Sequence, residues 1–339
     1  MSGPPAVKPA GWDGTIGPDS SPVSPLLPGI SSRPPAPMHR RTVLRLAPAA
    51  LAAAHLPLLA GAAAAAEDVR WKFEEGDTHT YAFDQAVTAT VTQFGQDSEL
   101  QNDLGFVLKW TIKGVNDDGS AVVDRTVERV TIKSSGGGAE TVDFDSAAEG
   151  EGDGVPARDP KTLPARVRVL GVLAGQTVTA TIKPDGTVED VELPDAVVRA
   201  IASAGPQNAF GEEQVKTLFT DQGFALPPAG AEPGTTYEAE ETLPLDFGTV
   251  IDARTMTLKS TGGGTAVIAI QSEQRAEEGT GPAGAPVLFE SGTQAGTATF
   301  STAGGFLAKV DTTGSATLTG PGGYKAVLKS TSKLRRTGD

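Results

Sequence analysis

The chain has 339 residues, of which 42 are acidic and 28 basic, and it contains no cysteine. This length provides for two ordinary domains of roughly 100 to 200 residues each. The absence of cysteine excludes disulfides, thiolate nucleophiles, cysteine-ligated zinc and a lipid-modified cysteine anchor. The formal net charge of −14 argues against nucleic acid and anionic membrane surfaces as partners.

The first 37 residues include ten prolines, a composition that cannot pack a hydrophobic core. We expect residues 1–37 to be disordered, and Met38 is an alternative start of the protein. Residues 38–66 follow the order of a signal peptide, with basic residues, a stretch rich in Ala and Leu, and a run of Ala. Cleavage is expected after Ala66.

Within this leader, the pair Arg40 and Arg41 followed by Thr-Val-Leu-Arg resembles a twin-arginine signal. An ordinary secretory signal is the alternative, and both predict export to the periplasm or the extracellular space. The apolar stretch is too short and too rich in alanine for a transmembrane helix, so no transmembrane segment is expected.

After the leader, the dominant pattern is an alternation of apolar and polar residues, which is typical of β-strands. Residues 78–92 carry Tyr81 and Phe83 on the odd face and mostly Thr and Ala on the even face. Such a strand would span roughly 50 Å at about 3.3 Å per residue, which predicts a large curved sheet. Residues 104–112 repeat the pattern, and the turn at 116–119 reverses the chain.

In the returning strand, residues 121–133, the apolar positions change from odd (Val123 and Val127) to even (Val130 and Ile132). A shift of one residue would turn every following side chain to the other face of the sheet. The sequence therefore predicts a β-bulge near Glu128 and Arg129.

The rest of the chain is expected to be mostly strands, interrupted by an acidic, Gly-rich loop at 134–165 and by two helices. The turn Pro184-Asp185-Gly186 suits the fixed φ of Pro and the left-handed conformation of Gly. The expected helices are 194–204, with Pro in the first turn, and 211–219. The expected strands are 166–172, 176–183, 187–191, 235–241, 251–260, 265–271, 295–302, 306–312, 315–318 and 324–330.

Three Gly-led strand starts recur in the same order before and after the helices, at Gly76, Gly119 and Gly186 and again at Gly234, Gly264 and Gly305. We therefore predict a mostly β fold, with long curved antiparallel sheets in two related β halves and one or two helices between them. The first half with its helix is assigned to residues 67–205, a short helix and Pro/Gly linker to 206–234, and the second half to 235–335.

Four segments together resemble an uncharacterised family of secreted bacterial proteins that is defined only as a domain of unknown function. They are residues 71–81, the hairpin 175–191 with the helix that follows it, the link 226–234, and residues 296–310. The resemblance covers most of residues 67–335. It implies export and a β-rich fold, and it implies no activity.

The sequence predicts no catalytic residues and no cofactor-binding residues. His79 is the only histidine after residue 66, and it lies on an apolar phase where packing is commoner than catalysis. No phosphate-loop, dinucleotide or metalloprotease motif is present. A secreted hydrolase that uses paired carboxylates is an alternative.

A weak metal site is predicted at Glu149, Glu151 and Asp153, with Asp143 and Asp145 nearby. The spacing resembles the start of a calcium-binding loop. The bidentate Glu that should close such a loop is replaced by Pro, so a solvated acidic loop is the alternative. Calcium is the only metal considered, and a calcium-binding surface protein is a further alternative function.

Five residues on the apolar phases of the first strands are candidates to line an internal cavity: Tyr81, Phe83, Phe106, Trp110 and Arg125. The leading hypothesis is an exported non-catalytic protein, either structural or a binding module. A curved sheet covered by helices can enclose an apolar cavity, so binding of a lipid or another apolar ligand is the more specific form of this hypothesis. For Arg125, a solvent-exposed face of a bent sheet is the alternative.

Overall fold

The computed structural model describes residues 68–137, 141–147, 164–204, 211–220, 224–245, 248–277 and 287–338. All of them belong to one compact unit, residues 61–339. The expected disordered segment 1–37, the signal peptide 38–66 with its cleavage site at Ala66, and the carboxylates Glu149, Glu151 and Asp153 lie outside the described residues.

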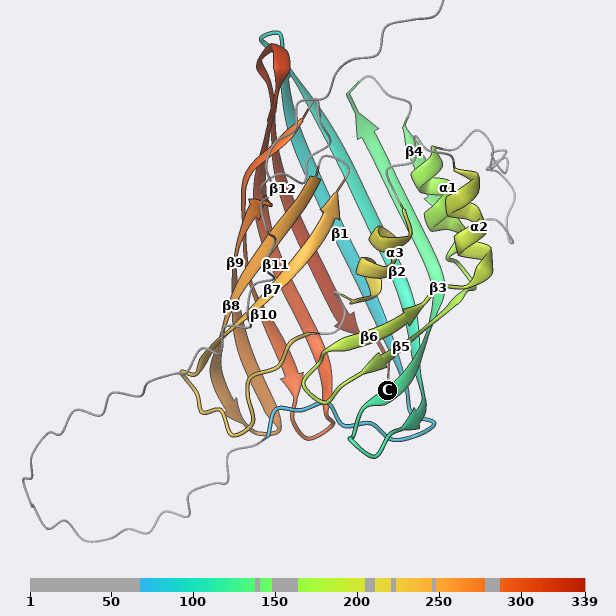
Figure 1. Ribbon diagram of the computed structural model, residues 1–339, viewed down its shortest axis with the longest axis vertical. Coiled ribbons are helices and arrows are strands. Elements are labelled where there is room, and N and C mark those ends of the chain that lie inside the picture. Colours follow the sequence, from blue (N-terminus) through green and yellow to red (C-terminus); the bar gives the residue numbers. More distant parts are fainter. Residues whose placement is uncertain are drawn as a thin grey trace, which may run out of the picture. The chain divides into compact units, whose positions relative to one another are not determined.

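The described residues form twelve strands in one antiparallel sheet, together with three α-helices (Figure 1). The helices are α1 (Ala165–Val172), α2 (Asp195–Ser203) and α3 (Glu212–Thr220). The strands of the first part are β1 (Thr78–Gln93), β2 (Gln96–Val115), β3 (Ala121–Gly136), β4 (Val142–Asp145), β5 (Thr177–Ile182) and β6 (Val188–Glu192). Those of the second part are β7 (Thr236–Leu245), β8 (Gly248–Gly262), β9 (Thr265–Ala276), β10 (Leu288–Ser301), β11 (Phe306–Gly320) and β12 (Tyr324–Arg336).

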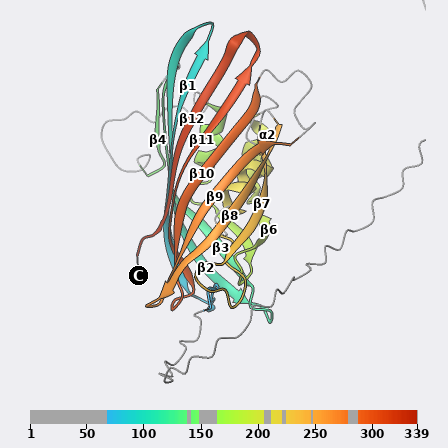
Figure 2. The same cartoon turned by 90° about the vertical axis from the view of Figure 1, so that its left-hand side faces the viewer.

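The strand order is β6-β5-β3-β2-β1-β12-β11-β10-β9-β8-β7, with β4 paired to β3. The pairing of β1 with β12, from Tyr81 opposite Arg336 to Thr92 opposite Lys325, joins the two predicted β regions into one sheet. Figure 2 shows the strands from β1 and β12 to β7 lying side by side in this order. The first and last strands of the described fold are therefore neighbours near the centre of the sheet.

The sheet is strongly curved, because α3 contacts both of its edge strands, β6 and β7. Its inner face carries the main hydrophobic core, which includes Tyr81, Leu108 and Trp110. Helix α3 and the segment 224–226 cover this face between the two edges. The segment 224–226 is held in place by a backbone hydrogen bond from the Leu226 amide to the Asp185 carbonyl at 2.9 Å.

The predicted bulge in β3 is confirmed. Val107 lies opposite Arg129 and Leu108 lies opposite Val127, so that Glu128 is the extra residue. Val127 and Val130 are both fully buried, whereas Glu128 and Arg129 are exposed. The bulge thus keeps the apolar residues on both sides of it directed into the same core.

The turn at 184–186 and both predicted helices are also confirmed. Gly186 has φ of +90° and donates its amide hydrogen bond to the Lys183 carbonyl at 2.9 Å. A Cβ at this position would meet the Phe224 carbonyl oxygen, so the turn needs glycine both for its backbone conformation and for its close approach to the link.

The strand predicted at 166–172 is wrong, because these residues form α1. Their Arg-Val-Arg-Val alternation fits a strand, but so short a stretch does not distinguish the two-residue period of a strand from the 3.6-residue period of a helix. The edge of β3 that a further strand would need is already paired with β4 and β5. As a helix, the segment instead buries Val167, Val169 and Leu170.

Two smaller predictions are corrected by the same sheet. The loop predicted at 134–165 contains the end of β3 and the whole of β4, whose Val142 is buried. The strands predicted at 306–312 and 315–318 are a single strand, β11, because its pairing with β12 continues through Thr313 and Gly314. Most other strands are longer than their apolar stretches, since pairing with long neighbours extends them beyond the core.

Candidate functional site

The inner face of the sheet changes in character along the strands. On β1, Tyr81 lies in the packed core, Phe83 comes next and Gln85 follows. On β12 the paired positions keep this order, with Leu334 beside Phe83 and Ser332 beside Gln85. On β2 the partners Phe106 and Leu104 are both apolar. A packed aromatic layer, an apolar layer and a polar layer therefore succeed one another.

The packed layer is built from aromatic rings and one buried charge. The ring centroids of Tyr81 and Trp110 lie 4.8 Å apart, and those of Trp71 and Trp110 lie 5.8 Å apart. The Arg125 guanidinium stacks on Trp110 and donates a hydrogen bond to the Phe219 carbonyl near the end of α3. Arg125 is 0% exposed, which excludes the solvent-exposed face considered as its alternative.

Desolvation by burial lowers the pKa of Arg125 to about 9, so the side chain still carries its charge at neutral pH. Within the described part of the chain, its Nε and one Nη have no hydrogen-bond partner, and neither have the Tyr81 hydroxyl and the Trp110 Nε1. Burial also raises the pKa of Tyr81. The guanidinium is thus held mainly by a ring and a carbonyl, with the Tyr81 hydroxyl and the Trp110 Nε1 enclosed beside it.

A cavity of about 480 Å³ lies next to this layer, between the sheet and its cover. Of the five candidate residues, Phe83 and Phe106 line it. Tyr81, Trp110 and Arg125 do not line the cavity, because they pack against one another in the layer next to it. Its other apolar lining residues are Val188, Leu218, Phe224, Ala225, Ala239, Met256, Ile270, Leu307, Val310 and Leu334.

One end of the cavity is polar, and we call these side chains the polar band. They come from seven neighbouring strands: Gln85, Ser332, Thr312, Gln294, Arg254 and Glu241 line the cavity, and Asp252 and Ser272 belong to the band through the ion pair of Asp252 with Arg254. The Gln294 amide donates to the Thr312 hydroxyl at 2.9 Å, and the Ser272 hydroxyl donates to Asp252. The band therefore consists of small groups of bonded side chains on neighbouring strands, of which Ser272, Asp252, Arg254 and Glu241 form the largest.

Arg254 is the charged centre of the polar band. Its Nε lies 2.6 Å from the Asp252 Oδ2, and one Nη lies 2.7 Å from the Glu241 Oε2. Asp252 is almost fully buried, with 1% exposure, whereas Arg254 and Glu241 are each about one quarter exposed. Buried charges need such partners. The sequence analysis missed this group, although Asp252 and Arg254 fall on the same phase as Val250 and Met256, which was a usable signal.

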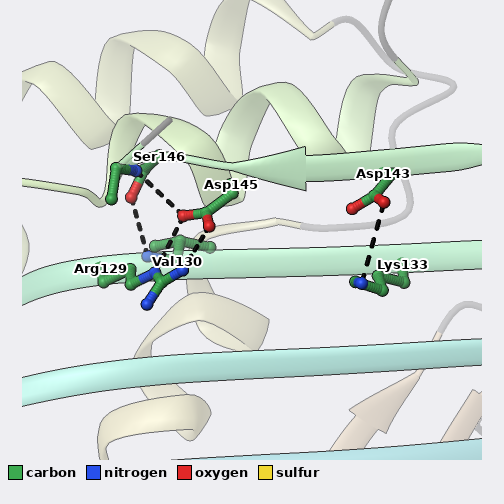
Figure 3. A network of polar contacts seen from close by, with 7 residues as sticks. Arg129, Val130, Lys133, Asp143, Asp145 and Ser146 are labelled. Carbon is green, nitrogen blue, oxygen red and sulfur yellow. Dashed lines mark hydrogen bonds and ion pairs between the residues drawn. The ribbon is translucent and has the colours of Figure 1, made fainter. Parts of the chain in front are cut away.

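The two described members of the predicted calcium site lie elsewhere, on β4, and both face basic residues (Figure 3). The Arg129 guanidinium donates two hydrogen bonds to Asp145, and this pairing holds the pKa of the Asp145 carboxyl below its usual range. Lys133 lies 3.8 Å from Asp143. Among the described residues, no group of three or more His, Cys, Asp or Glu could hold a metal ion.

His79 packs against Phe306, with ring centroids 5.4 Å apart. Burial, followed by the positive charge of Arg336, lowers its pKa. This histidine is not part of the cavity lining. None of the described helices is both long and apolar enough to cross a membrane.

Several solved structures resemble this one weakly. A structure that describes lipid–protein interactions in lipovitellin has a TM-score of 0.46 and 12% identity. The match covers 79% of this chain and 26% of lipovitellin, so the chain spans about a quarter of its length. An outer membrane channel from Pseudomonas putida F1 has a TM-score of 0.23 and 10% identity, over 79% of this chain and 97% of the channel.

A DUF1329 family protein from Desulfovibrio piger ATCC 29098 has a TM-score of 0.14 and 9% identity, over 77% of this chain and 87% of that protein. At these TM-scores none of the three similarities supports an argument about function. No curated protein matches the sequence significantly. The sequence model of a family of unknown function, DUF6263, matches residues 118–307, which is more than half of the chain. The chain belongs to this family.

Proposed function

We propose that this protein is an exported, non-catalytic binding protein that holds an apolar or amphipathic small molecule in the cavity between the sheet and its cover. The cavity itself carries the proposal. Its volume of about 480 Å³ lies in the range of small-molecule sites, roughly 300 to 1,000 Å³. A ligand that fills a largely apolar pocket of this size gains many close contacts with its lining.

The form of the lining supports binding. Aromatic and aliphatic side chains from both the sheet and the cover surround most of the space, and a few hydrogen-bonding side chains converge at one end. This combination is typical of sites in which apolar contacts give affinity and polar groups fix orientation. Because the rings of Phe83 and Phe106 lie on adjacent strands with centroids 6.1 Å apart, the apolar wall is continuous.

The alternative of a carboxylate-dependent hydrolase is less well supported. It needs one carboxyl group that donates a proton and another that accepts one. The two carboxylates of the polar band, Asp252 and Glu241, are both bound to the Arg254 guanidinium. Both carboxylates of the band thus share the same cation as their partner.

Binding can be tested with a neutral fluorescent probe and with the natural content of the protein. We expect Nile red to bind the purified protein, and organic extraction followed by mass spectrometry to release a co-purified apolar compound. Replacing Ala239, which lines the cavity, by Trp fills part of the space. Nile red affinity should then fall by about tenfold or more.

The matched control is Thr255→Trp, because Thr255 is an exposed residue on the neighbouring strand, β8. This variant adds the same side chain outside the cavity and should bind Nile red like the parent protein. Equal affinity of the two variants, or the failure of the parent protein to bind any apolar compound, would refute the proposed function.

A further inference from the structure

The polar band has an unusual charge arrangement for a site that meets the end of an amphipathic molecule. Its single guanidinium, Arg254, already faces two carboxylates, Asp252 at 2.6 Å and Glu241 at 2.7 Å. The three groups together carry a formal charge of −1. The positive charge of Arg254 is therefore already neutralised, and a ligand at this end of the cavity lies next to a net negative charge.

The other charged side chains of the lining do not change this balance. Lys333 is exposed and lies in register between Asp84 and Asp311 on the neighbouring strands. Glu240 lies 3.6 Å from Arg275, and both side chains are about 60% exposed. Charges that face water interact weakly with a group inside the cavity because solvent screens them.

The remaining members of the band are neutral hydrogen-bonding groups. Gln294 and Thr312 are bonded to each other, and the Gln85 amide lies 3.4 Å from the Ser332 hydroxyl. Amides and hydroxyls can both donate and accept, so they can receive a hydroxyl, ester or amide group of a ligand. A carboxylate is an acceptor only, and placing it beside Asp252 and Glu241 is disfavoured by like-charge repulsion in a partly desolvated site.

We infer, on the basis of the proposed binding function, that the ligand is an uncharged amphiphile whose apolar part occupies the cavity and whose hydroxyl, ester or amide end lies against the polar band. Fatty-acid anions and other ligands with an anionic end are disfavoured, because Asp252 and Glu241 already neutralise Arg254 and leave a net negative charge. Selection against anions thus comes from the two carboxylates and not from the size of the cavity.

The test compares two ligands with the same acyl chain, monoolein and oleate, as competitors of Nile red at pH 8 and low salt. Monoolein should displace the probe at a concentration at least about tenfold lower than oleate. Glu241→Gln removes one carboxylate from Arg254, and it should improve displacement by oleate about tenfold while leaving monoolein nearly unchanged. Glu238→Gln removes the same charge from an exposed side chain on the same strand that does not line the cavity, and it should change neither.

Equal or tighter binding of oleate by the parent protein would overturn this inference, and so would identical oleate binding by the parent and Glu241→Gln. In both cases Nile red binding would still support the proposed function. If neither Nile red nor monoolein binds, the proposed function itself fails. The thermal unfolding midpoint of each variant checks that it remains folded, and the double variant Asp252→Asn with Glu241→Gln, which leaves Arg254 with an unbalanced positive charge, should favour oleate still more.

Discussion

Arg125 stacks on Trp110 with its guanidinium carbon 4.4 Å from the ring centroid, although both side chains are almost completely buried. Its described hydrogen bond goes to the Phe219 carbonyl and not to a carboxylate. Removing a guanidinium from water costs several kcal/mol. The cation–π contact returns about 2 kcal/mol and the hydrogen bond about 1.5 to 3 kcal/mol. The net contribution of this charge to stability is therefore small.

The first prediction follows from the small net contribution of the Arg125 charge to stability. Arg125→Met keeps most of the volume and removes the buried charge, so the free energy of unfolding should stay within about 1 kcal/mol of the parent protein or increase. Arg125→Ala should be about 2 to 4 kcal/mol less stable than the Met variant because it leaves a void beside Trp110. Urea unfolding measures both. A Met variant as unstable as the Ala variant would show that the charge itself stabilises the core.

The second prediction concerns pH and His79. Burial and the charge of Arg336 hold the pKa of His79 below its ordinary value of 6.5. As the pH falls below about 6.5, the unfolded chain takes up this proton before the folded protein does, so the folded state loses stability until its own lower pKa is reached. Replacing His79 by Gln should make the decline in unfolding free energy between pH 7 and pH 5 shallower. If the unfolding free energies of the two proteins declined in parallel with pH, His79 would not contribute to the pH dependence of stability.

The sequence carried enough information for the strands that have one buried face. In β3 the apolar positions change from odd to even between Val127 and Val130, and this change locates the bulge at Glu128. The location follows because successive side chains of a strand alternate between the two faces of the sheet. Turn chemistry likewise fixed the hairpin around Gly186, whose positive φ and close approach to Phe224 leave no room for a side chain.

The parts that could not be predicted depend on contacts between distant residues. Nothing local distinguishes the helix α1 from a strand, since the decision comes from the occupied edge of β3. The cavity lining was predicted only for Phe83 and Phe106, because Tyr81 and Trp110 have the same pattern but are packed against Trp71 and Arg125. The polar band combines β1 with β7 to β12, so its members become neighbours only in the folded sheet.

The third prediction concerns the C-terminal strand. β12 lies between β1 and β11, and it pairs along most of its length with both. Truncation after Gly323 removes this strand and should abolish the cooperative unfolding transition, because it opens the sheet near its centre and not at an edge. Removal of residues 337–339 should have little effect. A truncated protein that still unfolds cooperatively would mean that the two parts of the sheet fold independently.

The last prediction measures the coupling of Arg254 to Asp252. Replacing Arg254 by Met leaves the carboxylate of Asp252, which is 1% exposed, with the Ser272 hydroxyl but without its cation. Breaking a buried pair in this way should lower the free energy of unfolding by about 3 to 5 kcal/mol. Asp252→Asn in the Arg254→Met background removes the uncompensated charge and should recover at least about 1 kcal/mol, although it adds a second substitution.

A matched cycle with the exposed pair Arg275 and Glu240 should give a coupling below about 1 kcal/mol. Urea unfolding of all variants at pH 7 gives both coupling energies, and a coupling for Arg254 and Asp252 as small as that of the exposed pair would show that solvent reaches the polar band freely.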